Sequence, residues 1–412
     1  MKKNIIKKYI VFRFETTKEY VTDKTKEEIK NGSILKFCQS PRKIVHELLH
    51  KLTGNPDPNN RLICLRALES QSADYAVAEE LVTSNGLQVL IKMVSEGNVS
   101  AQIVSLVVLT FHEVMKQEDL LSWEDEKISP EFIGQIAANI DTEKTMLALK
   151  QDERTQQCCL AVLEALVCTP SKYEVTEQNI SFSSLLNFIQ NDNPMVQQHA
   201  LALFNALFRL GDKNKKRKMK QIMEDRQTRR IIVEYIIRKG PNEEMQHQLY
   251  VLQTLLLNLL EERMYTMVES QGPKALEKIK ELRKIAFESR TESAPVQKRF
   301  AEEYKRLGFT NDVDPTQDFK EAPPGMLALD MMYAFACNHS DQYTKLVLES
   351  SCRGDQHDCP FARSSIEIVK LICQIIRIGH EPLPSGRQGG RFYPMFFTHE
   401  NPLEVSVRAQ YS

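Results

Sequence analysis

Two short pairs of cysteine and histidine have side chains that could bind a metal ion. Cys337 and His339 form one pair, and His357 and Cys359 form the other. Thiolates and imidazole nitrogens are the usual ligands of structural zinc, but such pairs commonly leave two to four residues between the ligands so that both reach one tetrahedral ion. Only one residue intervenes in each pair here. We therefore expect no metal site and no cofactor.

The densest run of charge could attract an anionic partner. Lys213-Asn-Lys-Lys-Arg-Lys-Met-Lys220 carries six basic side chains in eight residues. Such a run is compatible with a nuclear import signal or a phosphoinositide-binding patch. It is also compatible with a solvated loop and helix start between repeats, close to the acidic pair Glu224-Asp225. We favour the solvated segment, because basic runs are common and specify no partner by themselves.

The sequence lacks two motifs that would place a nucleotide or a nucleophile. The glycine-containing segment 386–390 has no Lys-Ser/Thr, as a phosphate-binding loop would require, and no Gly-X-Ser-X-Gly occurs. The nine histidines are dispersed along the 412 residues. We therefore expect a protein that is not an enzyme, with no catalytic residues and no small-molecule substrate.

Composition limits the remaining partners and the compartment. The formal net charge is -1 and aromatic residues make up 8%, with one Trp, so we expect no nucleic-acid partner. The apolar stretch from Leu249 to Met264 is broken by Gln253 and Asn258, and no run approaches a membrane span of about 18 apolar residues. The nine cysteines mostly stand in apolar stretches. We expect a cytoplasmic chain with reduced core thiols.

The first forty residues differ from the rest. Tyr9 to Phe14 and Ser33 to Phe37 are typical of short strands, and Thr25 to Lys30 is typical of a helical turn. The stretch from Tyr20 to Leu35 resembles the second half of a ubiquitin-like domain. Such a fold usually takes about 75–80 residues, so we expect a partial ubiquitin-like segment over residues 1–40.

From residue 41 onward the pattern is one helix after another. Asn85-Gly86 separates two apolar stripes, and Asp192 or Asn193 can cap a helix that begins at Pro194. Both segments resemble armadillo repeats. The helix from Pro194 bears two apolar stripes rather than one, as a helix between two neighbouring repeats requires. The residues of these stripes are Val196, Ala200, Leu201, Leu203, Phe204, Leu207, Phe208 and Leu210.

The armadillo resemblance points to two candidate partner-binding residues. Asn205 occupies the place where armadillo repeats often carry an asparagine that faces the groove and clamps the backbone of an extended peptide. Arg209 follows one turn later on the same helix. The alternative for Asn205 is a polar residue on the solvent edge of the helix.

The C-terminal third carries a more specific signature. Its blocks are Tyr304 to Phe309, Asp318-Phe-Lys-Glu-Ala-Pro-Pro-Gly-Met-Leu-Ala-Leu329, Cys359-Pro-Phe-Ala-Arg-Ser-Ser-Ile-Glu367 and Tyr393 to His399. These blocks, in this order, resemble the ELMO (engulfment and cell motility) family. The resemblance implies a mainly all-α fold, with an armadillo-type helical solenoid over 41–290 and a partial helical ELMO domain over 300–404.

The resemblance also implies a function. Family members are adaptors that link receptors and a RhoG-like small GTPase to DOCK-family exchange factors and Rac, for actin rearrangement in engulfment and cell motility. The armadillo groove would take a receptor cytoplasmic tail, and the chain would be recruited to the plasma membrane. Residues 405–412 do not follow the family pattern, and only half of the ubiquitin-like segment is present. The PH domain and the proline-rich tail, through which the family mainly engages the exchange factor, are also missing from this sequence. We therefore expect weakened binding of the GTPase and impaired binding of the exchange factor.

Lys320 suggests an alternative function within the same resemblance. In related proteins that consist of an ELMO domain, an arginine after a similar Asp-Phe is linked to activation of Arf-type GTPases. Arginine suits that task because its planar guanidinium makes paired hydrogen bonds to phosphate, whereas lysine is a point charge. A nuclear transport receptor would need regular Trp-Asn pairs, but the single Trp123 lies in a loop-like segment. The adaptor remains our preferred interpretation.

Overall fold

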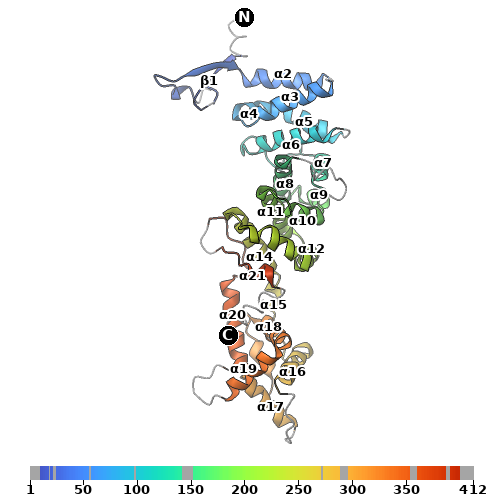
Figure 1. Cartoon of the computed structure of the whole chain (residues 1–412), viewed down its shortest axis with the longest axis vertical. Helices are drawn as coiled ribbons and strands as arrows, with labels where there is room; N and C mark the ends of the chain where they lie inside the picture. Colours follow the sequence, from blue (N-terminus) through green and yellow to red (C-terminus); the bar gives the residue numbers. More distant parts are fainter. Residues whose placement is uncertain are drawn as a thin grey trace. The chain divides into compact units, whose positions relative to one another are not determined.

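The computed structural model divides into two compact units, Met1–Asp212 and Lys213–Ser412 (Figure 1). The residues that the structure describes are 10–17, 19–21, 25–54, 57–96, 99–141, 152–270, 272–287, 296–352, 360–386 and 390–399.

The first unit opens with a β-hairpin. Strand β1 (Ile10–Phe14) pairs antiparallel with β2 (Leu35–Gln39), and the short 3-10 helix η1 (Lys26–Glu28) lies in the connection. Phe12 and Phe37 stand opposite each other with ring centroids 5.4 Å apart, and both rings are largely exposed. The first strand and the helical turn that the sequence predicted are present, and the second strand begins two residues later than predicted, at Leu35.

Ten helices follow among the described residues of the first unit. They are α2 (Pro41–Thr53), α3 (Pro58–Gln71), α4 (Tyr75–Thr83), α5 (Gly86–Ser95), α6 (Ala101–Met115), α7 (Pro130–Ala138), α8 (Glu153–Val167), α9 (Tyr173–Gln178), α10 (Phe182–Ile189) and α11 (Pro194–Leu210). Helix α3 packs on α6, α6 on α8, and α8 on α11. We call these four helices the helix row. The other helices pack beside the row and against one another, as α2 does on α4 and α5 does on α7.

Local sequence explains why helices begin where they do. Asn193, one of the two predicted caps, accepts a hydrogen bond from the backbone N–H of Met195 at the start of α11. Asn85 takes a left-handed conformation with φ of 56° between α4 and α5. At Gly86 a Cβ would lie 2.5 Å from the Cδ1 atom of Leu81 and 2.7 Å from that of Leu49, so a larger residue would require both leucine side chains to move.

Helix α11 confirms the prediction of two apolar stripes, with one exception. Seven of the eight predicted residues are buried, but Leu210 is 43% exposed. Leu210 is the last residue of the helix, immediately before Gly211. Periodicity alone did not reveal that the buried part of the helix ends two residues earlier, at Phe208.

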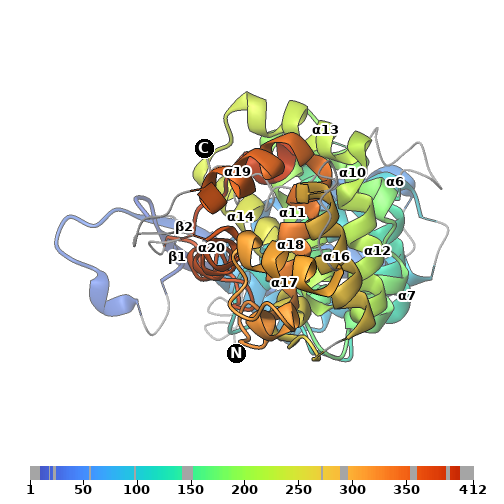
Figure 2. The ribbon, with the colours of Figure 1, turned by 90° about the horizontal axis from the view of Figure 1, so that it is seen from below.

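The second unit contains the remaining helices of the described residues. They are α12 (Lys213–Glu224), α13 (Arg226–Tyr235), η3 (Ile237–Lys239), α14 (Glu243–Asn258), α15 (Glu261–Tyr265), α16 (Pro273–Phe287), α17 (Val296–Leu307), η4 (Pro315–Phe319), α18 (Gly325–Asn338), α19 (Ser340–Cys352), α20 (Phe361–Ile375) and α21 (Met395–Thr398). Helix α18 packs against α15, α16, α19 and α20. Figure 2 shows α16 and α20 on either side of it.

An aromatic cluster forms part of the core around α18. The ring of Phe361 lies 5.1 Å from that of Tyr343 and 6.4 Å from that of Phe335. The hydroxyl of the fully buried Tyr343 donates a hydrogen bond of 3.0 Å to the carbonyl of Leu282. This bond satisfies the polar group that the ring brings into the core.

The Pro-Pro-Gly block of the C-terminal signature has a structural role. Gly325 has φ of +50°, and a Cβ there would lie 2.4 Å from the carbonyl oxygen of Thr266. The same oxygen accepts a hydrogen bond of 2.8 Å from the N–H of Met326. Glycine is therefore needed for the start of α18 to reach the segment after α15.

The described residues form a mainly helical fold with a small N-terminal sheet, as the sequence predicted. Within these ranges, no helix is both long enough and apolar enough to cross a membrane.

Candidate partner-binding surface on the helix row

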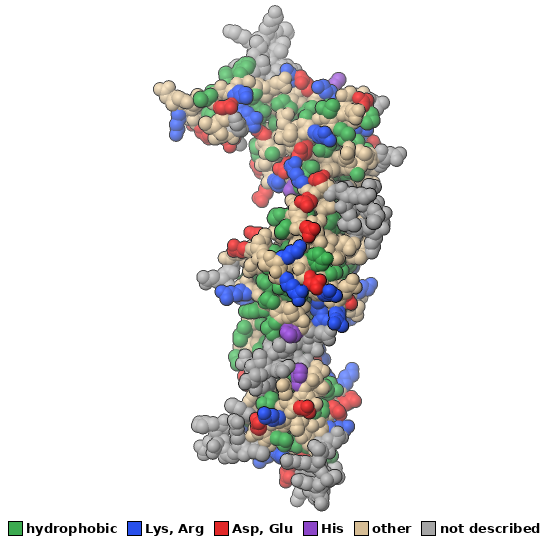
Figure 3. Space-filling model, in the orientation of Figure 1, with side chains coloured by type: hydrophobic (Ala, Val, Ile, Leu, Met, Phe, Trp, Pro, Cys, Tyr) green, Lys and Arg blue, Asp and Glu red, His purple; other side chains and the backbone are tan. Residues whose placement is uncertain are grey.

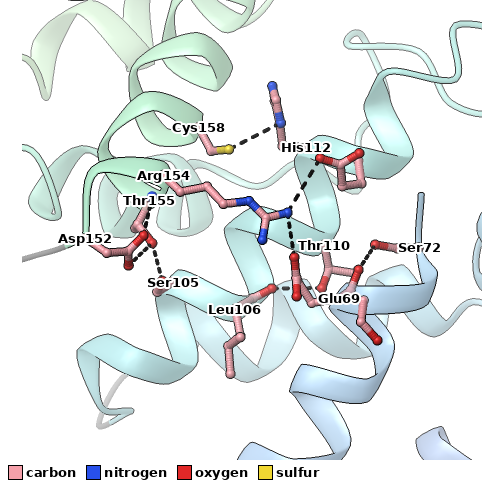
Figure 4. A network of polar contacts seen from close by, with 12 residues as sticks. Glu69, Ser72, Ser105, Leu106, Thr110, His112, Asp152, Arg154, Thr155 and Cys158 are labelled. Carbon is pink, nitrogen blue, oxygen red and sulfur yellow. Dashed lines mark hydrogen bonds and ion pairs between the residues drawn. The ribbon is translucent and has the colours of Figure 1, made fainter. Parts of the chain in front are cut away.

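One arginine connects three helices of the row. The Nη2 atom of Arg154, in the first turn of α8, lies 2.7 Å from Oε1 of Glu69 on α3 and 4.0 Å from Oε1 of Glu113 on α6 (Figure 4). Arg154 is 57% exposed, whereas the two carboxylates are only 13% and 16% exposed. Lys116 adds a second cation 2.9 Å from Glu113. On this side of the row the basic side chains of Arg154 and Lys116 are therefore exposed, whereas the carboxylates with which they pair are largely buried.

The N-terminus of α8 is fixed by a polar cluster beside Arg154. Asp152 caps the helix, because its carboxylate accepts hydrogen bonds from the N–H and the hydroxyl of Thr155 at 2.9 and 2.7 Å. The Thr155 hydroxyl also contacts that of Ser105 on α6. Figure 4 shows Asp152, Thr155 and Ser105 next to Arg154 at the start of α8. The cap thus holds the first turn of α8, from which Arg154 extends.

A histidine and a cysteine meet on the same surface. Nδ1 of His112 lies 3.4 Å from Sγ of Cys158. Burial raises the pKa of Cys158 to about 11, and burial together with Lys116 lowers the pKa of His112 to about 4. Both groups are therefore neutral at pH 7. A thiol nucleophile needs the thiolate, so this contact contributes packing rather than a reactive dyad.

The predicted residue Arg209 lies on α11, the last helix of the row. It is exposed in the last turn of α11, and its Nη2 atom donates to Sγ of Cys168, 3.7 Å away. Burial raises the pKa of the nearby Glu164 on α8 to about 6, although Arg209 opposes this shift. A second charged group, formed by Arg209 and Glu164, therefore lies near the C-terminal end of α8.

The predicted residue Asn205 is placed differently. It lies one turn before Arg209 on α11, but only 3% of it is exposed. It is therefore not at the solvent edge of the helix, which was the alternative considered from the sequence. The structure brings Arg209 to the surface of the row and keeps Asn205 beneath it.

The third predicted residue, Lys320, belongs to the second unit. It is exposed directly after η4. The preceding Asp318 accepts hydrogen bonds from the N–H groups of Thr310 and Asn311, at 2.6 and 3.3 Å, and Phe319 is 1% exposed. The Asp-Phe pair therefore stabilises a loop and fills the core, and Lys320 follows it at the surface.

A cavity of about 1000 Å³ lies between the hairpin and α4. Nη2 of Arg13 on β1 lies 3.1 Å from Oδ2 of Asp74, the residue that caps α4. The Arg13 guanidinium also stands 5.1 Å from the centre of the Tyr20 ring. These contacts fasten the hairpin to the first helices and leave the aromatic pair of the hairpin exposed.

The cysteine and histidine pairs can be followed only in part. Cys337 is exposed on α18, and the His339 ring lies against Phe335. His357 and Cys359 lie outside the described residues. Within the described ranges, no three His, Cys, Asp or Glu side chains are grouped so that they could hold a metal ion. Of the predicted core thiols, Cys158, Cys159 and Cys373 are buried, whereas Cys168 is exposed.

The sequence reasoning missed two features. Arg154 escaped notice because its partners are distant in the chain, and the only local signal was a carboxylate inside otherwise apolar helices. The second feature is His46-Glu-Leu-Leu-His50, which has the His-Glu-X-X-His spacing of zinc proteases. In the structure both histidines are exposed on α2, and Nε2 of His46 lies 3.5 Å from a carboxylate oxygen of Glu80. The motif thus lies on the surface of a packed helix.

Comparison with known proteins covers most of the chain. The model described as "ELMO, armadillo-like helical domain" matches residues 76–237, and that of the "ELMO/CED-12 family" matches 258–406. Engulfment and cell motility proteins 1 and 2 of Homo sapiens are each 36% identical to this chain, over 407 and 400 residues. Engulfment and cell motility protein 3 of Homo sapiens is 33% identical over 390 residues. The matches confirm the predicted fold class.

The relatives are longer than this chain. The alignments cover 93%, 93% and 92% of the chain but 54%, 54% and 52% of the three human proteins. The chain therefore spans about half the length of the curated relatives it matches.

Proposed function

Because this chain belongs to the ELMO/CED-12 family, we propose that it is a non-enzymatic signalling adaptor for engulfment and cell motility. In this role it links receptors and a RhoG-like small GTPase to a DOCK-family exchange factor and Rac. It works in the cytoplasm and is recruited to the plasma membrane through its partners.

The observation that carries the proposal is the helix row with its bridging arginine. Stacked helices of this kind form extended surfaces that bind partners through many side chains. Arg154 connects three row helices and keeps more than half of its surface exposed. Arg209 adds a further exposed cation on α11. The row therefore offers a broad polar surface with exposed cations on α8 and α11, which suits an extended peptide with acidic residues rather than a compact substrate.

We assign each partner to a part of the chain. The receptor cytoplasmic tail lies along the row and meets Arg154 and Arg209. Asn205 reaches the peptide backbone only if α11 shifts, because the residue is buried. The small GTPase uses the N-terminal segment 1–40, where the rings of Phe12 and Phe37 are exposed. The DOCK-family factor is contacted by the second unit, with Lys320 available at its surface.

The test uses purified components. The chain is titrated against cytoplasmic tails of engulfment receptors, and the variant Arg154→Ala/Arg209→Ala is compared with the control Lys92→Ala/Lys345→Ala. The control removes two exposed cations from outside the row. We expect the row variant to bind about tenfold more weakly, as the loss of about 1.4 kcal/mol implies, and the control to bind normally. Equal binding by both variants, or no tail bound by a folded chain, would refute the proposal.

A second arm addresses the exchange factor. The same chain is used to co-precipitate a purified DOCK-family protein. Binding means that the two units carry a contact surface for the exchange factor. No binding, from a chain whose circular dichroism is helical, limits the adaptor role of this chain to its receptor-facing part.

A further inference from the structure

The strongest local charge in the molecule lies at the start of the second unit. Residues 213–239, which form α12, α13 and η3, contain eleven Lys or Arg but only three Asp or Glu, a local charge of +8. The whole chain has a formal net charge of -1. The eight-residue basic run noted in the sequence is thus one part of a larger basic surface, which we call the α12–α13 patch.

The helices arrange these cations on defined faces. On α12, Lys213, Lys216, Arg217 and Lys220 recur at positions i, i+3, i+4 and i+7, which places them on one side of the helix. Met219 and Met223 of the same helix are buried. Figure 3 shows Lys and Arg side chains gathered over α12.

Helix α13 repeats the pattern. Arg226, Arg229 and Arg230 stand at i, i+3 and i+4, while Thr228 and Ile232 face the interior. Helix α12 packs on α13. The two basic faces therefore belong to one packed pair of helices.

The acidic residues of the patch neutralise little of this charge. Asp225 caps α13 and accepts hydrogen bonds from two backbone N–H groups, of Gln227 and Thr228. Glu224 pairs with Lys220, and Glu234 is shared by Arg230 and Arg238. Lys213, Arg230 and Arg238 still expose 82%, 75% and 71% of their side chains. Exposed pairs of this kind hold their side chains weakly, so the cations can turn to an external anion.

We propose that the α12–α13 patch binds directly to a membrane surface rich in anionic lipids. Basic clusters are attracted to such surfaces with a contribution from each Lys or Arg near the headgroups. Half-buried aliphatic residues and Tyr235 accompany the cations on α13 and η3, and tyrosine is favoured at the membrane–water interface. The contact is independent of any partner on the helix row.

Nucleic acid is the competing anionic partner. Proteins that bind single strands offer several aromatic rings for stacking. Tyr235 is the only aromatic residue among residues 213–239, and the ammonium of Lys239 lies 5.5 Å from the centre of its ring. The composition of the patch therefore favours a lipid surface.

The test is vesicle flotation with the purified full chain and no other protein. Vesicles of phosphatidylcholine alone are compared with vesicles that also contain phosphatidylserine, at low and at physiological salt. We expect flotation only with the anionic vesicles, and weaker flotation at the higher salt. No flotation with anionic vesicles at low salt would overturn the proposal, and so would equal flotation with neutral vesicles.

A charge variant locates the contact. Lys213→Gln, Lys216→Gln, Arg217→Gln and Lys220→Gln are combined in one chain, which keeps helix propensity because Lys, Arg and Gln are similar helix formers. We expect binding to anionic vesicles to fall about tenfold or more. Circular dichroism shows whether the variant is folded. A folded variant that floats as well as the original chain would place the contact elsewhere and overturn the proposal.

A matched control separates local charge from total charge. Lys51→Gln, Lys92→Gln, Lys284→Gln and Lys345→Gln remove four exposed or half-exposed cations from other helices. We expect this control to float normally. A loss equal to that of the patch variant would mean that net charge alone governs binding. Binding to duplex DNA is measured at the same salt concentration for comparison. Tighter binding to DNA than to anionic vesicles would also overturn the proposal.

Discussion

The guanidinium of Arg154 lies 2.7 Å from the carboxylate of Glu69, so a residue at the start of α8 is paired with one near the end of α3. Helix α6 packs against both of these helices. The pair therefore spans the α3–α6 and α6–α8 interfaces of the row. Its coupling free energy reports whether these helices stabilise one another through the charged surface.

A double-mutant cycle measures this pair. Arg154→Ala, Glu69→Ala and the double variant are unfolded with urea, and the fluorescence of Trp123 reports on the first unit because its ring packs 5.9 Å from that of Phe111. We expect a coupling free energy of about 0.2–1 kcal/mol, because Arg154 is 57% exposed. The coupling should shrink in high salt. Strictly additive single variants would show that the pair contributes nothing.

The next prediction concerns the Asp-Phe-Lys sequence of the second unit. Asp318→Ala should lower the free energy of unfolding by about 0.5–1.5 kcal/mol, because two exposed N–H groups exchange a carboxylate acceptor for water. Lys320→Ala should change it by less than about 0.5 kcal/mol, since the side chain is exposed. Amide hydrogen exchange at Thr310 and Asn311 checks the first effect directly. Unchanged protection in Asp318→Ala would contradict the assigned role.

The same two variants bear on the alternative function. We expect neither the original chain nor Lys320→Ala to accelerate GTP hydrolysis by an Arf-type GTPase, because a lysine ammonium does not make the paired phosphate contacts of an arginine. Single-turnover hydrolysis of labelled GTP is the measurement. If the original chain accelerates GTP hydrolysis and Lys320→Ala does not, the proposed adaptor function would have to be replaced by that of a GTPase-activating protein.

A buried ion pair gives the largest expected change in stability. Nη1 of Arg283 lies 2.7 Å from a carboxylate oxygen of Glu303, and the two side chains are 16% and 8% exposed. Glu303→Ala should cost about 3–5 kcal/mol, because it leaves a guanidinium without its counter-charge in the interior. Thermal unfolding of the second unit is the readout. Lys345→Ala, which removes an exposed pair with Glu349, is the control and should cost less than about 1 kcal/mol. Equal costs for the two variants would contradict the burial argument.

His112 predicts a pH dependence for the first unit. Burial, helped by Lys116, lowers its pKa from 6.5 to about 4. Between these two values the unfolded chain binds a proton that the folded chain does not, so stability falls as the pH decreases from 6.5 to 4. His112→Asn should flatten this part of the pH profile by up to about 3 kcal/mol. Urea titrations at pH 7 and pH 4.5 make the comparison, and an unchanged slope would contradict it.

Local sequence predicted the elements well and the surface poorly. Asn85-Gly86 and Asn193-Pro194 mark helix boundaries through backbone conformation and capping, which depend on neighbouring residues alone. The two stripes of α11 likewise follow from spacing. The exposure of Leu210 did not follow, because the end of a packed helix depends on where the adjacent helices end.

The candidate site shows the same division. Asn205 and Arg209 are one turn apart on α11, yet Asn205 is buried and Arg209 is exposed, because the packing of the helices around α11 decides which of them reaches the surface. Arg154 could not be found from local patterns, since its partners lie on α3 and α6. The His46-Glu-Leu-Leu-His50 motif is the converse case, because a spacing that can bind zinc lies here on an exposed helix surface.

The order of the helix row also determines how the first unit would come apart. Each row helix packs mainly on the next one, so α3 has one row neighbour whereas α8 lies between α6 and α11. Opening of α3 would shorten the stack from one end, but opening of α8 would divide it into two pieces that no longer support each other. A protease acting on the native protein should therefore remove α3 or α11, the two end helices of the row, before it separates α6 from α8. Local unfolding of the first unit would therefore begin at an end of the helix row rather than in its middle.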